Sequence, residues 1–130
     1  MHLLAIFTLT LLTYVSLVNA KGYILRVAHQ KRGILTLSFD PSASRNKSIQ
    51  LLTTTNAGYQ PGWLHSRGKY LYSVSRTYFP GNYSTSGGIF IFKKSANGRL
   101  ELFDSVPSYG NSAVYLDITP NGKTLSVANM

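Results

Sequence analysis

Two stretches of this chain carry nearly the same phrase: residues 63–74 read WLHSRGKYLYSV, and residues 115–127 read YLDITPNGKTLSV. In each stretch a Gly-Lys pair closes a turn immediately before a run with β-strand character. The two pairs, Gly68-Lys69 and Gly122-Lys123, lie 54 positions apart. Self-similarity at a spacing of this size indicates a repeat architecture.

The sequence around the two copies predicts short antiparallel strands joined by glycine turns. Its nine Tyr, six Phe and 11 Gly favour aromatic strands and tight turns over helices. Asn97-Gly98 is a strong hairpin signal because both residues tolerate a positive φ. Residues 35–39 alternate large apolar with small polar side chains, as a half-buried strand does. The expected strands are residues 23–28, 33–39, 48–53, 62–66, 69–75, 88–93, 99–105, 114–118 and 124–128.

A cycle of roughly 50 residues with four short strands is the signature of a β-propeller blade. When the strands of a blade are named A to D from the axis outwards, the chain reads B-C-D, A-B-C-D, A-B. No A strand fits before Tyr23 in the first cycle, and propellers commonly complete one blade with strands from both chain ends. We therefore expect the N-terminal third of a larger ring or a truncated product. The alternative is a short two-sheet β protein with a duplicated hairpin.

Residues 1–20, MHLLAIFTLTLLTYVSLVNA, are apolar, lack acidic side chains and end in Val18-Asn19-Ala20. This pattern predicts a signal peptide cleaved after Ala20, and residues 21–130 as the mature, secreted chain without a membrane anchor. A retained anchor is the competing interpretation. Asn46-Lys47-Ser48 and Asn82-Tyr83-Ser84 are acceptor triplets, so Asn46 and Asn82 are candidate glycosylation sites in an exported protein.

The chain is strongly basic, with 13 Lys and Arg against four Asp and Glu and a net charge of +9. One interpretation is an ordinary solvated basic surface, and the other is attraction of a small anionic ligand into a cleft. Nucleic-acid binding is not expected, because the basic residues are scattered and no recognition motif is present. The sequence also contains no cysteine, no metal-spaced histidines and no phosphate-binding loop, so no metal site or cofactor is predicted.

Several motifs, in their order along the chain, resemble the lactonase-type seven-bladed propeller family. They are GILTLSFD at residues 33–40, PGWL at 61–64, GGIFIF at 87–92, NGRL at 97–100 and TPNGKTLSVAN at 119–129. The family includes bacterial 6-phosphogluconolactonases and fungal carboxy-cis,cis-muconate cyclases. The resemblance spans residues 23–129 and implies an all-β fold with about two blades of an incomplete seven-bladed ring. It also implies a small anionic lactone or carboxylate as substrate. The catalytic residues of the family come largely from later blades, so none is assigned.

Propeller geometry still ranks the candidate site residues, because B–C and D–A loops fall on one face of the ring. Arg76 suits a carboxylate or phosphate, since a guanidinium can bind either in a bidentate manner. His29 suits general acid–base chemistry near neutral pH. His65 lies within an A strand, where packing is its expected role. The substrate-binding candidates are His29, Tyr59, Arg76 and Asn129, with Asn56, Tyr109 and Asn111 in the same D–A loops.

Three functions remain open from the sequence. The first is an exported lactonase-like enzyme that hydrolyses a phosphorylated sugar lactone or interconverts a carboxymuconate and its lactone. The second is a non-catalytic propeller that binds protein or glycan through its loop face, suggested by the long polar loop at residues 76–87 and its acceptor triplet. The third is a non-functional truncated product whose open sheet edges aggregate.

Overall fold

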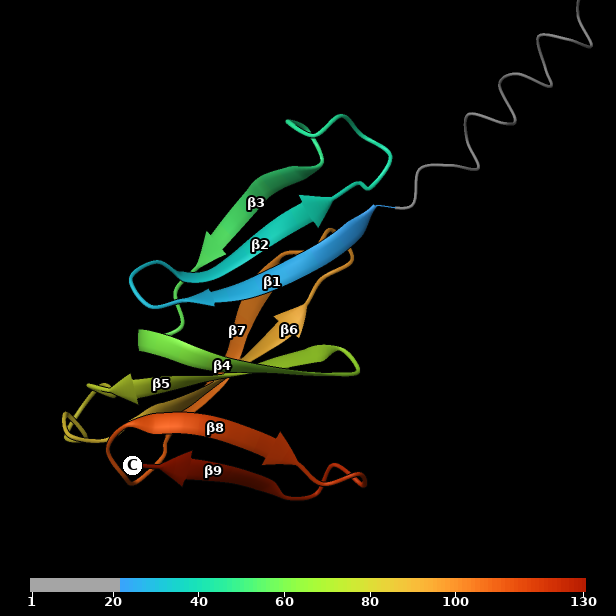
Figure 1. Ribbon diagram of the computed structural model, residues 1–130. Helices are drawn as coiled ribbons and strands as arrows, with labels where there is room; N and C mark the ends of the chain where they lie inside the picture. The colour runs from blue at the N-terminus through green and yellow to red at the C-terminus, as the bar shows by residue number, and fades with distance from the viewer. Residues whose placement is uncertain (1–21) are drawn as a thin grey trace, which may run out of the picture.

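The computed structural model describes residues 22–130, in which nine strands pair antiparallel in three separate sheets (Figure 1). The predicted signal peptide, residues 1–20, lies outside the described residues. The first sheet has the order β1-β2-β3, the second β4-β5-β6-β7 and the third β8-β9. The strands are β1 (Tyr23–His29), β2 (Gly33–Phe39), β3 (Ile49–Thr55), β4 (Tyr59–Arg67), β5 (Tyr70–Thr77), β6 (Gly88–Lys94), β7 (Leu100–Pro107), β8 (Ala113–Ile118) and β9 (Leu125–Asn129).

This grouping confirms the predicted order of three, four and two strands. Several strand ends differ from the expected ones by one or two residues, and the largest difference is at β4, which begins at Tyr59, a residue that we expected in a loop. The reason is the strand beside it, since Tyr59 pairs with Thr77 and Pro61 with Ser75 of β5. A bulge at Gly62, between Pro61 and Trp63, then shifts the register by one residue. The glycine and proline that mark a turn in the sequence therefore lie inside a strand.

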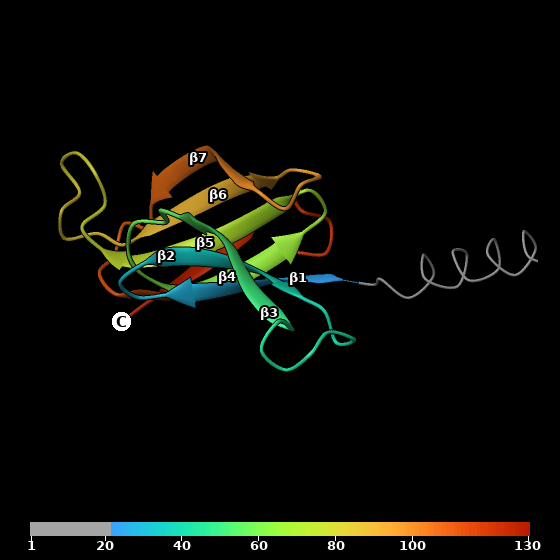
Figure 2. The same cartoon turned by 90° about the horizontal axis from the view of Figure 1, so that it is seen from above.

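The three sheets converge along one side and separate along the other. The principal contacts between sheets join β1 and β2 to β4, and β4 and β5 to β8. The last strand of each of the first two cycles, β3 or β7, is the edge strand of its sheet that lies away from these contacts (Figures 1 and 2). This radial arrangement is that of propeller blades, with β4 and β8 as neighbouring inner strands. The described residues do not close into a ring.

Two hydrophobic cores lie between the sheets. The first joins the first two sheets and the second joins the last two, so β5 and β6 of the four-stranded sheet are buried on both faces. The first core consists of Ile34, Ala57, Leu71, Phe79, Phe90 and Phe92, and the second of Val74, Ile89, Ala113, Leu116 and Ile118. Stability thus resides in contacts between neighbouring blades, as in other repeat architectures.

In the first sheet, the buried face of β2 is not the face that carries its regularly spaced large apolar side chains. Ile34 and Thr36 of β2 have no exposed surface, whereas Leu35 and Leu37 are only half-buried. Ile34 packs in the first core, and Leu35 and Leu37 point to the opposite face because side chains alternate along a strand. The larger apolar residues of β2 therefore lie on the face that no other described sheet covers.

Candidate functional site

The three B strands, which are β1, β5 and β9, end at one edge of the molecule. Figure 1 shows the arrowheads of β1, β5 and β9 at that edge, where the β3–β4 and β7–β8 connections also lie. His29 and Asn129 are the last residues of β1 and β9, and Arg76 is the penultimate residue of β5. The loop between β5 and β6 projects beyond the sheets at the same edge (Figure 2). We call this edge the loop face.

His29 supports the turn that follows it. Its Nδ1 accepts hydrogen bonds from the backbone N–H groups of Lys31 and Arg32, both at 3.2 Å. This arrangement fixes the orientation of the ring and leaves Nε2 as the nitrogen that a ligand could reach. The side chain is half-buried. His29 therefore closes the β1–β2 turn, and any acid–base role would fall to Nε2.

Arg76 differs from His29 and Asn129, because its guanidinium has no hydrogen-bond or salt-bridge partner among residues 22–130. The residue is half-buried at the end of β5. It lies two positions after Val74, so strand alternation places it on the face turned toward the third sheet. A half-buried guanidinium without a protein partner is suited to bind an external carboxylate or phosphate.

Asn129 holds the β7–β8 loop. The Ser108 hydroxyl lies 2.8 Å from Asn129 Oδ1 and 2.9 Å from the carbonyl of Gly110, and Asn129 Nδ2 donates to the carbonyl of Ser108 at 3.4 Å. A Cβ on Gly110 would lie 2.6 Å from Cγ of Asn129, so glycine is needed for this close approach. Asn129 is thus a positioning residue for the loop that carries Tyr109 and Asn111.

The fourth substrate-binding candidate, Tyr59, packs against another tyrosine. Its ring meets Tyr78 edge to face, with centroids 4.7 Å apart and an interplanar angle of 85°. Both rings are exposed, and Tyr78 has a left-handed backbone with φ of 57°. This pair joins the start of β4 to the start of the β5–β6 loop.

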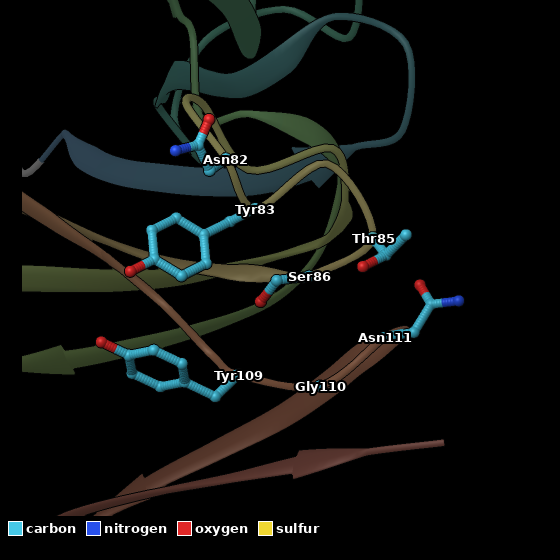
Figure 3. A pocket seen from close by; sticks show the side chains of 7 residues that line it. All are labelled: Asn82, Tyr83, Thr85, Ser86, Tyr109, Gly110 and Asn111. Carbon is cyan, nitrogen blue, oxygen red and sulfur yellow. The ribbon is translucent and has the colours of Figure 1, made fainter.

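A pocket of about 290 Å³ opens at the loop face between the β5–β6 and β7–β8 loops (Figure 3). We call it the tyrosine pocket, because Tyr83 and Tyr109 lie on one side of it. Two of the D–A loop candidates, Tyr109 and Asn111, line this pocket. Asn82, one of the two candidate glycosylation sites, lines it as well. His29, Tyr59, Arg76 and Asn129 do not line it. The lining residues are Asn82, Tyr83, Thr85, Ser86, Tyr109, Gly110 and Asn111.

The sequence did not single out Tyr83, Thr85, Ser86 or Gly110 as site residues. Two signals could have found them. The β5–β6 loop combines tyrosine with small hydroxyl residues, and strand order assigns it to the same face as the β7–β8 loop. The two loops are tied by backbone hydrogen bonds from Gly87 N–H to the Gly110 carbonyl (2.8 Å) and from Ser108 N–H to the Gly87 carbonyl (2.9 Å).

A second pocket, of about 240 Å³, lies between the first two sheets and contains no residue predicted for the site. Arg26 lines it and donates from Nη2 to the carbonyl of Gly98 at 3.2 Å. Burial lowers the pKa of the Arg26 guanidinium from its usual value. The hydrogen bond to Gly98 ties β1 to the β6–β7 turn, so Arg26 has a structural role between blades.

Charge on the described surface is largely uncompensated. Within residues 22–130, one contact joins a base to a carboxylate: His65 Nδ1 lies 3.7 Å from Asp117 Oδ1, between β4 and β8. The packing role expected for His65 thus takes the form of a contact between inner strands. The same part of the chain contains no group of three His, Cys, Asp or Glu residues that could hold a metal ion, and no helix able to cross a membrane.

Radial antiparallel sheets with a shared loop face define a β-propeller protein. The family model described as "Lactonase, 7-bladed beta-propeller" matches residues 15–130, and the chain belongs to that family. Comparison with curated proteins and with solved structures gave no match.

Proposed function

We propose that this chain is the N-terminal part of an exported lactonase-like propeller enzyme that acts on a small anionic lactone or on its open acid. The observation that carries the proposal is Arg76, which supplies an unpaired, half-buried guanidinium on the loop face. Membership of the lactonase family supports the reaction class. The net charge of +9 favours an anionic substrate, because it concentrates anions near the surface.

In this proposal the described blades bind substrate, and the later blades supply the reacting groups. Arg76 would hold the carboxylate or phosphate of the substrate through two parallel N–H donors. His29 lies at the equivalent strand end of the preceding blade, and its Nε2 is available to a ligand at the same face. Fixing the anionic group in this way would orient the lactone ring toward the remaining blades.

The complete propeller should turn over either sugar lactones or carboxymuconates. The Arg76→Gln variant should lose roughly 10- to 100-fold in kcat/KM, because a hydrogen bond to a charged group contributes about 1.5–3 kcal/mol. Arg45→Gln is the matched control: it makes the same change in the exposed β2–β3 loop and should leave turnover unchanged. Unaltered kcat/KM in Arg76→Gln would remove Arg76 from the site, and no turnover by the complete protein would refute the enzymatic proposal.

A binding function without catalysis is the second candidate, and the exposed tyrosines of the loop face favour it. Tyr59, Tyr78, Tyr83 and Tyr109 all expose their rings there. Large exposed aromatic groups gathered on one face commonly mark a recognition surface. Saturable binding of a partner by a complete propeller that turns over no lactone would support this function over the first.

A further inference from the structure

The tyrosine pocket has a lining that the proposed substrate does not explain. None of its seven lining residues carries a charge, although the chain as a whole has a net charge of +9. Figure 3 shows Tyr83 and Tyr109 together on one side, with Thr85 and Asn111 on the other. The two rings meet edge to face, with centroids 5.8 Å apart and an interplanar angle of 89°. The pocket therefore offers apolar ring surface beside uncharged donors and acceptors.

The β5–β6 wall of the pocket is fixed by its own hydrogen bonds. Backbone N–H groups of Tyr78, Phe79 and Ser86 donate to the carbonyls of Ser84, Ser86 and Tyr83 at 3.1, 3.1 and 2.8 Å. Phe79 is buried in the first core and packs on Phe90, with centroids 5.9 Å apart. This long loop is therefore anchored at its base.

The β7–β8 wall is fixed to the first one. The hydrogen bonds between Gly87 and the 108–110 segment join the two loops, and Asn129 is hydrogen-bonded to Ser108 in that segment. Tyr109 has a left-handed backbone with φ of 56°, and the residue is 78% exposed. Walls held in this way are ready to bind without a large ordering cost.

We propose that the tyrosine pocket binds one neutral pyranose ring. A sugar has an apolar face of C–H groups, which packs on aromatic rings, and a rim of hydroxyls, which pairs with amides and side-chain hydroxyls. The lining provides both kinds of group and lacks the cation that an acidic ligand would favour. Small-molecule pockets typically measure about 300–1,000 Å³, so about 290 Å³ fits a single ring. This inference does not rest on the proposed lactonase activity.

The pyranose that binds in the pocket has two possible sources. One is the first sugar of a glycan on Asn82, because Asn82 lines the pocket and begins an Asn-Tyr-Ser acceptor triplet. The other is a separate saccharide. Asn46 provides an internal comparison, since its triplet lies in the exposed β2–β3 loop, away from the pocket.

The first arm of the test uses the full chain made without glycans. Amide resonances are followed by NMR during titration with N-acetylglucosamine, methyl glucoside and gluconate. We expect saturable shifts at Tyr83, Ser86 and Gly110 with either neutral sugar, with an affinity in roughly the millimolar range for so small a ligand. Shifts with gluconate alone, or no saturable shift with either neutral sugar, would overturn the proposal.

Two variants test the lining. Tyr109→Ala removes an exposed ring and should weaken binding at least tenfold, and Thr85→Val should weaken it by removing one hydroxyl. Tyr23→Ala is the matched control, because it removes another exposed tyrosine ring, on β1, that does not line the pocket. Equal binding by Tyr109→Ala and the wild type would refute the site. Since this readout is binding, it fails or succeeds separately from the turnover assay of Arg76→Gln.

The second arm identifies the source. The full chain is made in a secretory eukaryotic host, and glycopeptide mass spectrometry establishes whether Asn82 carries a glycan. If it does, and the glycosylated protein no longer responds to added N-acetylglucosamine, the ring is the protein's own. If Asn82 is unmodified, or if the glycosylated protein still responds, the ring is external. Either result supports the site once the first arm has shown binding.

Discussion

Gly87 occupies the crossing point of three segments at the loop face, and the space for a side chain there is already filled. A Cβ at this position would lie 2.7 Å from Cβ of Ala113, 2.7 Å from the carbonyl oxygen of Ser75 and 2.8 Å from that of Arg76. Two of these neighbours are backbone atoms of β5, which cannot move without disturbing the sheet. Gly87 also makes both hydrogen bonds that tie the β5–β6 loop to the β7–β8 loop.

Replacing Gly87 with alanine should therefore destabilise the fold. Overpacking of this kind typically costs about 1–3 kcal/mol. Gly62→Ala is the control, because the nearest atom to a Cβ there is a carbonyl oxygen 4.0 Å away. The measurement is the free energy of unfolding of each variant in urea. If Gly87→Ala unfolds at the same urea concentration as Gly62→Ala, the two loops are not held as closely as the structure shows.

Asp40 directly follows β2 and forms a local hydrogen-bond cluster. Its Oδ1 accepts from the hydroxyl of Ser42 at 2.6 Å and from the N–H of Ser42 at 2.8 Å. These bonds, the hydroxyl first, lower the pKa of the Asp40 carboxyl from its ordinary value. A lowered folded-state pKa means that the ionised form favours the folded loop. That contribution is complete above the unfolded pKa and is lost as the pH falls through the folded pKa.

Ser42→Ala should raise the pKa of Asp40 toward its ordinary value, because the hydroxyl is the larger cause of the shift. Carboxyl NMR titration of the wild type and the variant measures this directly. Ser44→Ala is a suitable control in the same exposed loop, since its side chain does not contact Asp40. An Asp40 titration that is identical in Ser42→Ala and wild type would contradict the assignment.

At the scale of the elements, equivalent positions of neighbouring inner strands meet side by side. Trp63 packs on Tyr115 with ring centroids 4.7 Å apart, and His65 lies beside Asp117. Arg67 donates from its two terminal guanidinium nitrogens to the carbonyls of Thr119 and Pro120 in the β8–β9 turn. One repeat unit thus docks on the next through three successive contacts along β4 and β8.

Arg67→Lys should loosen the β8–β9 turn, because an ammonium group cannot reproduce the two-pronged donation of a guanidinium. We expect a loss of about 1 kcal/mol in local stability. Hydrogen exchange at the Gly122 amide, which donates to the Thr119 carbonyl within this turn, measures that loss. The control is Arg45→Lys in the exposed β2–β3 loop. Unchanged exchange at Gly122 would show that Arg67 does not hold the turn.

The order of the strands was predictable because turn chemistry and alternation repeat in every cycle. The start of β4 was not, since Tyr59 is in a strand only through its pairing with Thr77. The buried face of β2 was not predictable either. Its alternation shows that two faces differ, but the identity of the face that meets β4 depends on the neighbouring sheet. The turn-like Gly62 likewise becomes a bulge only when β5 lies beside it.

The candidate site was predicted as a location rather than as a set of contacts. Tyr109 and Asn111 were expected in D–A loops, and they line the tyrosine pocket at the loop face, whereas the four substrate-binding candidates do not. The partnership of Tyr83 with Tyr109 depends on how the two loops fold toward each other. The hydrogen bonds of Asn129 to Ser108 are similarly tertiary, so its positioning role could not be derived from the sequence.

At the scale of the molecule, one face of the first sheet is apolar, and no other sheet within residues 22–130 covers it. This is the face that carries Leu35 and Leu37. Cross-strand pairing aligns its side chains in rows across the sheet. One row joins Leu25, Leu37 and Leu51, and the next joins Tyr23, Phe39 and Ile49. Leu25, Leu51 and Ile49 are each more than a third exposed, which is unusual for aligned neighbours on one sheet face. In a seven-bladed ring such a face packs against another blade.

The predicted mature chain, residues 21–130, should therefore self-associate through this face, because contact removes a continuous apolar surface from water. Sedimentation velocity at increasing protein concentration should show the weight-average mass rising above that of the monomer. Leu51→Lys places a charge in the centre of the face and should shift the mass back toward the monomer. Ser44→Lys adds the same charge in the adjacent exposed loop and should leave association unchanged. A wild-type chain that stays monomeric at every concentration would show that the open face needs no neighbour.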